Sequence, residues 1–214
     1  MRTTSDIPAL KRRHVALLGT LAVVALWSWI EPKDRLTWWL EAFPALIAVM
    51  IMVATYRRFR LTDLLYGLAW IHAVILLVGA HYTYADVPLF DWIQEALDQS
   101  RNHYDRVGHV AQGFVPAIAA RELLLRTSPL QRGKWLAVLV VLSCAGISAI
   151  YELLEFAAAA ATGEAATAFL AFQGDVWDTQ KDMLLALLGA ITALALCSRL
   201  HDRQLARFGV GSAE

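Results

Sequence analysis

The stretch WLAVLVVLSCAGISAIYELLEFAAAA, residues 135–160, decides the class of fold to which this chain belongs. It is almost wholly apolar over more than the about 20 residues that a helix needs to cross a bilayer. Its only charged residues are Glu152 and Glu155, near its end. Five further apolar blocks lie at about 14–30, 38–56, 62–80, 106–125 and 182–198. Long continuous blocks predict helices, because the strands of a membrane barrel show short alternating segments.

The composition agrees with a membrane protein. The 214 residues are 58% hydrophobic and 18% charged, and the mean hydropathy is +0.48. We therefore predict an all-α fold: a polytopic membrane bundle of six transmembrane helices that forms a single integral membrane domain over residues 1–214. The segment 106–125 is the most polar of the six, since it opens with Arg106, His109 and Gln112. The lipid bilayer is the expected partner, and no nucleic acid is expected.

The basic residues predict the orientation, because loops rich in Lys and Arg stay in the cytoplasm. On a six-span map, 14 of the 19 basic residues lie on the side of the two termini. The opposite side holds only Lys33, Arg35, Arg101, Arg106 and Lys181. We expect a multi-pass protein of the bacterial inner (cytoplasmic) membrane with both termini in the cytoplasm.

The outer loop between the third and fourth spans contains a second helical pattern. Pro88 suits the first turn of a helix. The apolar residues Phe90, Ile93 and Leu97 then share one face, and acidic residues share the other. This pattern predicts an amphipathic helix that lies on the outer membrane interface.

Acidic residues and a histidine collect at the outer ends of three spans. Ionisable groups at bilayer depth are costly and usually face a bundle interior or a wet cavity. Here they recur at helical spacing, so each set forms one stripe along its helix. The three sets are Asn102/Asp105/His109, Ser148/Glu152/Glu155 and Asp175/Asp178/Asp182.

Histidine together with carboxylates favours zinc, iron or manganese over magnesium or calcium. We predict His109, Glu152 and Asp182 as ligands of a divalent metal, with zinc favoured. A metal-bound water with a nearby carboxylate as base would hydrolyse an ester or amide, and Asp105, Glu155 and Asp178 are the predicted catalytic groups. The predicted substrate-contacting rim is His81, His103, Tyr151, Asp175 and Trp177.

Three functions stay open at this point, and the sequence does not decide whether the chain is an enzyme. The first is a metal-dependent hydrolase or transferase that acts on a lipid or lipid-linked envelope substrate entering from the outer leaflet. The second is a proton- or cation-coupled transporter. The third is a non-catalytic envelope protein in which Arg101, Arg106 and Lys181 neutralise the acids as internal ion pairs. Apolar residues below the stripes, at 136–141 and 183–188, favour a half-open pocket over a conducting path. The oligomeric state is equally open.

Four stretches resemble the YjdF family of bacterial inner-membrane proteins. They are HYTYADVPLFDW (81–92), SRNHYDRVGHVAQGFVPA (100–117), SAIYELLEF (148–156) and GDVWDTQKDMLLALLGA (174–190). The resemblance implies an integral membrane protein and no particular reaction.

A more distant resemblance is to VanZ-like membrane proteins. They place an acid and a histidine at a helix start, as at Asp105 and His109, and a glutamate late in the next span, as at Glu152. Their glycine-containing final span opens with an aspartate, as at Asp182 before Gly189. No role in glycopeptide resistance follows from this analogy.

Overall fold

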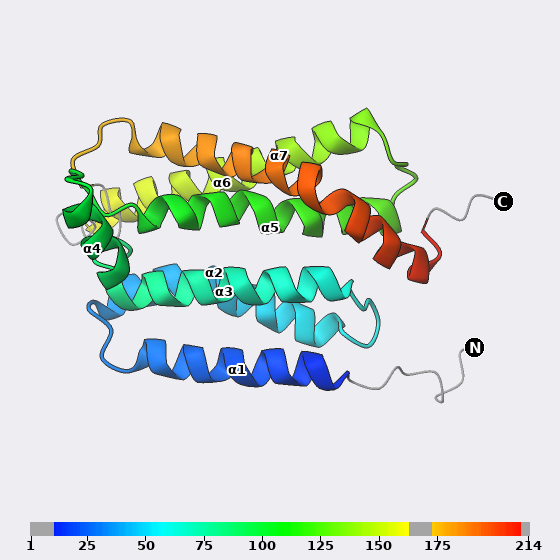
Figure 1. Cartoon of the computed structure of the whole chain (residues 1–214), viewed down its shortest axis with the longest axis horizontal. Helices are drawn as coiled ribbons and strands as arrows, with labels where there is room; N and C mark the ends of the chain where they lie inside the picture. The colour runs from blue at the N-terminus through cyan, green and yellow to red at the C-terminus, as the bar shows by residue number, and fades with distance from the viewer. Residues whose placement is uncertain (1–10, 163–172, 211–214) are drawn as a thin grey trace.

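The computed structural model describes residues 11–162 and 173–210, and the regular structure within these two ranges is entirely helical. Six long helices run roughly along one direction, and the short α4 lies across one end of them (Figure 1). The start of α1 and the end of α7 lie at the opposite end of the bundle (Figure 1). The helices are α1 (Arg12–Trp29), α2 (Arg35–Thr55), α3 (Asp63–Tyr82), α4 (Pro88–Ala96), α5 (Tyr104–Thr127), α6 (Lys134–Thr162) and α7 (Asp178–Leu205), followed by a short 3-10 turn (Ala206–Phe208).

Each of the six apolar blocks coincides with one long helix, so the prediction of an all-helical fold is confirmed. Four helices, α2, α3, α6 and α7, are long and apolar enough to cross a membrane. The other two are more polar: α1 begins with Arg12, Arg13 and His14, and α5 carries charged residues in its first and last turns. The count of six spans and the interfacial position of α4 therefore remain predictions.

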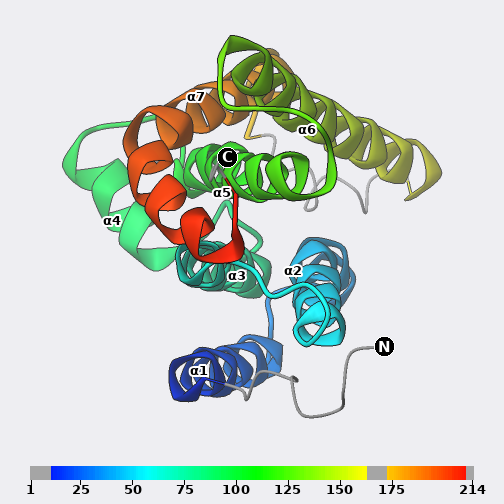
Figure 2. The same ribbon diagram turned by 90° about the vertical axis from the view of Figure 1, so that its right-hand side faces the viewer.

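The bundle consists of two groups of three long helices. α1 and α2 pack on α3, and α6 and α7 pack with α5, while α3 and α5 join the groups (Figure 2). The core beside α5 is built from Val115, Ile118, Leu136, Val140 and Ala190, together with smaller neighbours. α5 is therefore the central helix, and its side chains face both groups.

Glycines allow α5 and α7 to approach backbone to backbone. A Cβ atom on Gly113 would collide with the carbonyl oxygen of Ala186, and one on Gly189 would collide with the carbonyl oxygen of Val110. Small residues at such positions are typical of closely packed membrane helices. Gly108 serves a different purpose, because its Cβ would lie 3.0 Å from the ring of Tyr84.

A largely buried polar network lies near the end of the bundle opposite α4 and links α3, α5 and α7. The carboxylate of Glu122 accepts hydrogen bonds from the backbone N–H and the hydroxyl of Thr62, at 3.0 and 2.7 Å, and from Arg126 at 2.7 Å. The His201 Nε2 atom lies 3.1 Å from the same carboxylate. Because every oxygen of Glu122 has partners, this cluster stabilises the helix ends rather than offering a vacant site.

The glycine contact predicts a sharp difference between two identical substitutions. Gly113→Ala should lower the free energy of unfolding by about 2 kcal/mol, because the new methyl group overpacks the α5–α7 contact. Gly146→Ala in α6 meets no atom within 4 Å and should be neutral or stabilising by up to about 1 kcal/mol through helix propensity. Thermal unfolding of both variants in the same detergent, followed by circular dichroism, measures the difference. Equal effects of the two substitutions would contradict the packing described here.

Candidate metal centre and adjoining cavity

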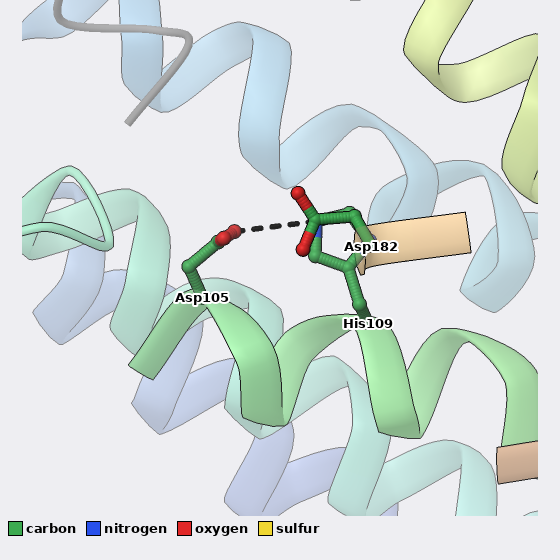
Figure 3. A group of neighbouring side chains, drawn as sticks. All are labelled: Asp105, His109 and Asp182. Atoms are coloured by element: carbon green, nitrogen blue, oxygen red, sulfur yellow. Dashed lines mark ion pairs between the residues drawn. The ribbon is translucent and has the colours of Figure 1, made fainter. Parts of the chain in front are cut away.

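The tightest group of metal-ligating side chains lies between α5 and α7, at the end of the bundle that carries α4. Asp105 and His109 are one turn apart on α5, and Asp182 lies one turn inside α7 (Figure 3). All three residues are buried. The close glycine contact between α5 and α7 brings these three side chains together, because it leaves little space between the two helices at this depth.

The geometry centres on the imidazole of His109. Its Nε2 atom lies 3.3 Å from Asp105 Oδ1 and 3.7 Å from Asp182 Oδ1. One donor atom from each residue lies within 4.8 Å of the other two. On the other side of the ring, Nδ1 lies 3.0 Å from the side-chain oxygen of Gln112. That bond is made when Nδ1 carries the proton, which leaves the Nε2 lone pair facing the two aspartates.

Glu152 approaches the same imidazole from its opposite edge. Its Oε1 atom lies 3.9 Å from His109 Nδ1 and has no hydrogen-bond partner in the described ranges, although only 7% of the residue is exposed. The sequence grouped His109, Glu152 and Asp182 as ligands. The structure brings Asp105, His109 and Asp182 closest, because Asp105 lies one turn before His109 on the same helix face.

Two arginines hold the neighbouring aspartates. Arg106 pairs closely with Asp182 and lies 2.5 Å from Asp178 and 3.1 Å from Asp175. Arg101 lies 2.5 Å from Asp178 and 3.5 Å from Asp105. Asp178, predicted as a catalytic group, therefore accepts from two guanidinium groups, and this pairing opposes a role as a base.

The predicted rim residues outside the helices are also held by charges. Asp175 lies 2.6 Å from the Lys181 ammonium, and this hydrogen bond, with that from the Trp177 backbone, lowers the pKa of its carboxyl group. His103 precedes α5, and partial burial together with Arg101 and Arg106 lowers the pKa of its imidazole. Asp175 and His103 are both partly exposed and lie just before the first turns of α7 and α5.

An elongated cavity of about 580 Å³ adjoins this centre, between the two groups of helices. Its polar end is lined by Glu41, Tyr84, Asp105, His109, Tyr151 and Glu155. Its walls are otherwise mainly apolar side chains of α2, α3, α5 and α6, and they extend to Phe59, Leu123 and Thr127 near the end of the bundle opposite α4. The cavity therefore joins a group of ionisable side chains to a long apolar space.

Not every predicted rim residue reaches this site. Tyr151 and the predicted catalytic Glu155 line the cavity. Trp177 is exposed just before α7. His81 instead belongs to the contact between α1 and α3: its ring stacks on Trp27 at 4.6 Å, and its Nδ1 atom lies 3.1 Å from the carbonyl oxygen of Ser28. Its position at the end of α3 turns it away from α5.

Three residues of the site were not predicted. Glu41 is the only acid in the apolar block 38–56, and an acid within a span is by itself a signal of function. Gln112 lies three residues after His109, within reach of its ring. Tyr84 follows α3 in a left-handed turn, with φ of 58° at Thr83 and 53° at Tyr84. No sequence pattern predicts that this turn folds the tyrosine back beside Gly79 and Gly108.

The ion pairs predict unequal effects of removing two basic residues. Arg106→Ala should lower the free energy of unfolding by about 3 kcal/mol, because it removes the positive charge that faces the buried carboxylates of Asp178 and Asp182. Lys181→Ala should cost less than about 1 kcal/mol, because this ion pair is exposed to solvent. Thermal unfolding at matched detergent and salt concentration tests both. An Arg106→Ala variant as stable as Lys181→Ala would show that the arginine does not hold the aspartates.

This chain is similar to known membrane proteins over most of its length. Residues 13–203 match the family described as "Predicted membrane protein (DUF2238)". The Escherichia coli (strain K12) protein "Inner membrane protein YjdF" is 49% identical over 191 residues, which cover 89% of this chain and 91% of that protein. No solved structure matches. The resemblance to the YjdF family is thus confirmed, and the chain belongs to this DUF2238 family of integral membrane proteins.

Proposed function

We propose that this protein is a metal-dependent hydrolase or transferase that acts on a lipid or lipid-linked molecule of the cell envelope. One observation carries the proposal: the Asp105–His109–Asp182 group stands at the polar end of a largely apolar cavity of about 580 Å³. Ligand pockets combine apolar walls with a few converging polar groups. Here the polar groups are ones that bind metals, and the walls suit a hydrocarbon chain.

The arrangement around His109 supports a metal site. A metal-binding histidine usually donates its second ring N–H to an oxygen, which orients the ring. The Gln112 oxygen, 3.0 Å from Nδ1, meets this requirement, and Nε2 then faces Asp105 and Asp182. Glu152 Oε1 is buried and lacks a hydrogen-bond partner among the described residues. A cation near His109 would compensate the charge of this carboxylate.

The donor set of one imidazole and two carboxylates suits zinc best among the common metals. A bound ion would lower the pKa of a water or polarise a carbonyl or phosphoryl oxygen. Asp105, His109 and Asp182 would hold it. Glu155, which lines the cavity without an ion pair in the described part of the chain, is the carboxylate best placed to act as a base. Arg106 would position Asp182 through their ion pair.

The proposal includes a membrane topology. In addition to the four apolar helices, α1 and α5 would cross the bilayer, which gives six spans with both termini in the cytoplasm. α4 would lie on the outer interface, where its exposed Leu89, Trp92 and the following Leu97 contact lipid. The metal centre then lies at outer-leaflet depth, and an amphiphilic substrate enters from the membrane.

Two observations bear on the alternative functions. Apolar residues such as Val115, Ile118 and Val140 form the core on the inner side of His109, before the Glu122 network is reached. This layer argues against a continuous polar path for a transported ion. Ion pairing alone accounts for Asp175, Asp178 and Asp182, but it leaves Glu152 with only the imidazole of His109, at 3.9 Å, and Glu41 with no ion-pair partner in the described ranges. A purely structural role therefore explains only part of the acidic cluster.

Metal analysis tests the centre. The protein purified without chelators should contain about one zinc per chain, and His109→Ala and Asp182→Ala should lose it, because each removes a ligand. Gln112→Leu should weaken zinc binding by roughly tenfold to a hundredfold, because it removes the oxygen that orients the His109 ring. His103→Ala serves as the control, since it removes an imidazole outside the centre. A parent protein without stoichiometric metal would refute the metalloenzyme proposal, and metal retained by both ligand variants would refute the ligand set.

The topology is testable on its own. A reporter that is active only in the cytoplasm should give full signal when fused after residue 214 and none when inserted between residues 97 and 100, at the end of the α4 segment. On the six-span map three spans, α5, α6 and α7, separate these two positions and place them on opposite sides of the membrane. If α5 does not cross the bilayer, only two spans separate them and both fusions should give the same signal. A periplasmic C-terminus would overturn both the six-span map and the outer location of the metal centre.

A further inference from the structure

Glu41 is a buried acid that the metal centre does not use. It lies on α2, only 6% of the residue is exposed, and it lines the polar end of the cavity. Within the ranges 11–162 and 173–210 its carboxyl group has no hydrogen-bond or ion-pair partner, and the charged groups that act on it are Asp105 and, with the opposite effect, His109. A buried carboxylate without a partner carries a desolvation penalty of several kcal/mol. The charge of this carboxylate is offset either by a proton or by a cationic ligand in the cavity.

Three other polar side chains surround the same space. The carboxyl group of Glu155 and the hydroxyl groups of Tyr84 and Tyr151 line the cavity with Glu41. In the described part of the chain, none of these three groups hydrogen-bonds to another side chain or to the backbone. They come from separate segments: Tyr84 follows α3, and the other two lie on α6. The polar end therefore presents two carboxyl groups and two tyrosines to the cavity, beside His109 and Gln112, which line the same space.

The placement of Tyr84 shows how closely this wall is constructed. The chain leaves α3 through two residues in the left-handed conformation, Thr83 and Tyr84. The tyrosine ring then lies against Gly79 and Gly108, where any Cβ atom would collide with or crowd the ring. Its ring is buried, with 5% of the residue exposed. Glycines on α3 and α5, Gly79 and Gly108, thus leave the space that the Tyr84 ring occupies beside the cavity.

We propose that this wall binds the ammonium group of an amphiphile whose hydrocarbon chain occupies the apolar part of the cavity. An ammonium group offers three donors and a positive charge, and ionised carboxylates only accept. Tyrosine faces add cation–π attraction. An anionic head group is disfavoured by Glu41, Asp105 and Glu155. The nearby guanidinium groups do not offset these charges, because Arg101 and Arg106 pair with the aspartates on the α7 side.

The ammonium site and the metal centre are neighbours along one cavity. The metal group lies between α5 and α7, whereas Glu41, Tyr84 and Tyr151 belong to the α2, α3 and α6 walls. An amphiphile held by its amine would present adjacent polar atoms to the metal centre. This amphiphile is the substrate only if the proposed function holds, but its binding can be measured by itself.

Three ligands with one hydrocarbon chain test the charge preference directly. Dodecylamine, N-dodecylacetamide and dodecanoate carry a positive, a neutral and a negative head on chains of similar length. Native mass spectrometry of the parent protein in a neutral detergent should show dodecylamine bound at least about tenfold more tightly than either of the others, since one charged hydrogen bond is worth about 1.5–3 kcal/mol and 1.4 kcal/mol is tenfold. Equal or tighter binding of the acetamide or the carboxylate would overturn the proposal without any variant.

Variants then locate the site. Glu41→Gln should weaken dodecylamine binding by about tenfold and leave zinc content unchanged. Tyr84→Phe and Tyr151→Phe should weaken dodecylamine binding less, since each variant keeps the aromatic ring and its cation–π attraction. Glu95→Gln, which removes an exposed acid of α4, is the matched control and should have no effect. Unchanged amine binding in folded Glu41→Gln would refute the assignment.

The metal variants separate this inference from the proposed function. His109→Ala should lose zinc and retain dodecylamine binding within about threefold, because the amine partners lie on other helices. Zinc absent from the parent with selective amine binding intact would refute the metalloenzyme but not the ammonium site. Stoichiometric zinc without amine selectivity would refute the ammonium site alone.

Discussion

The contact between α5 and α7 is the constraint on which the site depends. At Gly113 and Gly189 each helix meets the carbonyl group of the other, with no room for a side chain. This approach holds the outer turns of both helices together, so Asp105 and His109 face Asp182 across a short gap. Lipid supplies no hydrophobic force between helices, so close packing and polar pairs must hold them. The Arg106 ion pairs with Asp178 and Asp182 reinforce the same contact.

Charge compensation divides the acids of the outer end into two kinds. The aspartates of the α7 segment face Arg101, Arg106 and Lys181, and ion pairs account for their burial. Glu41 and Glu155 line the cavity instead, and Glu152 lies beside His109. No basic side chain in the described ranges approaches these three glutamates within ion-pair distance except the imidazole of His109. Carboxylates that are buried without compensation require a cation or a proton. In both proposed sites, the metal centre and the ammonium site, a cation would neutralise buried carboxylates.

Much of the fold follows from local pattern. The apolar blocks lie where the long helices lie, because a span must satisfy its own backbone and expose apolar side chains to lipid. The helical spacing of Asp105 and His109, and of Asp178 and Asp182, also predicted stripes on single helix faces. Asn102 and Asp175 lie outside their stripes, because α5 begins at Tyr104 and α7 at Asp178. Helix ends depend on capping and on neighbouring segments, which periodicity does not report.

The sequence by itself determined the membrane class, the helical elements and the end of the bundle at which ionisable groups gather, since these depend on residue type and on distance along one chain. Only the tertiary structure decided which groups meet. In the folded chain Asp105, rather than Glu152, lies closest to His109 Nε2. Asp178 forms ion pairs with two arginines, Arg101 and Arg106. His81 packs in the contact between α1 and α3. The tertiary structure also brings Glu41 and Tyr84 to the cavity. These outcomes depend on helix rotation and on approach between distant segments, which tertiary packing alone sets.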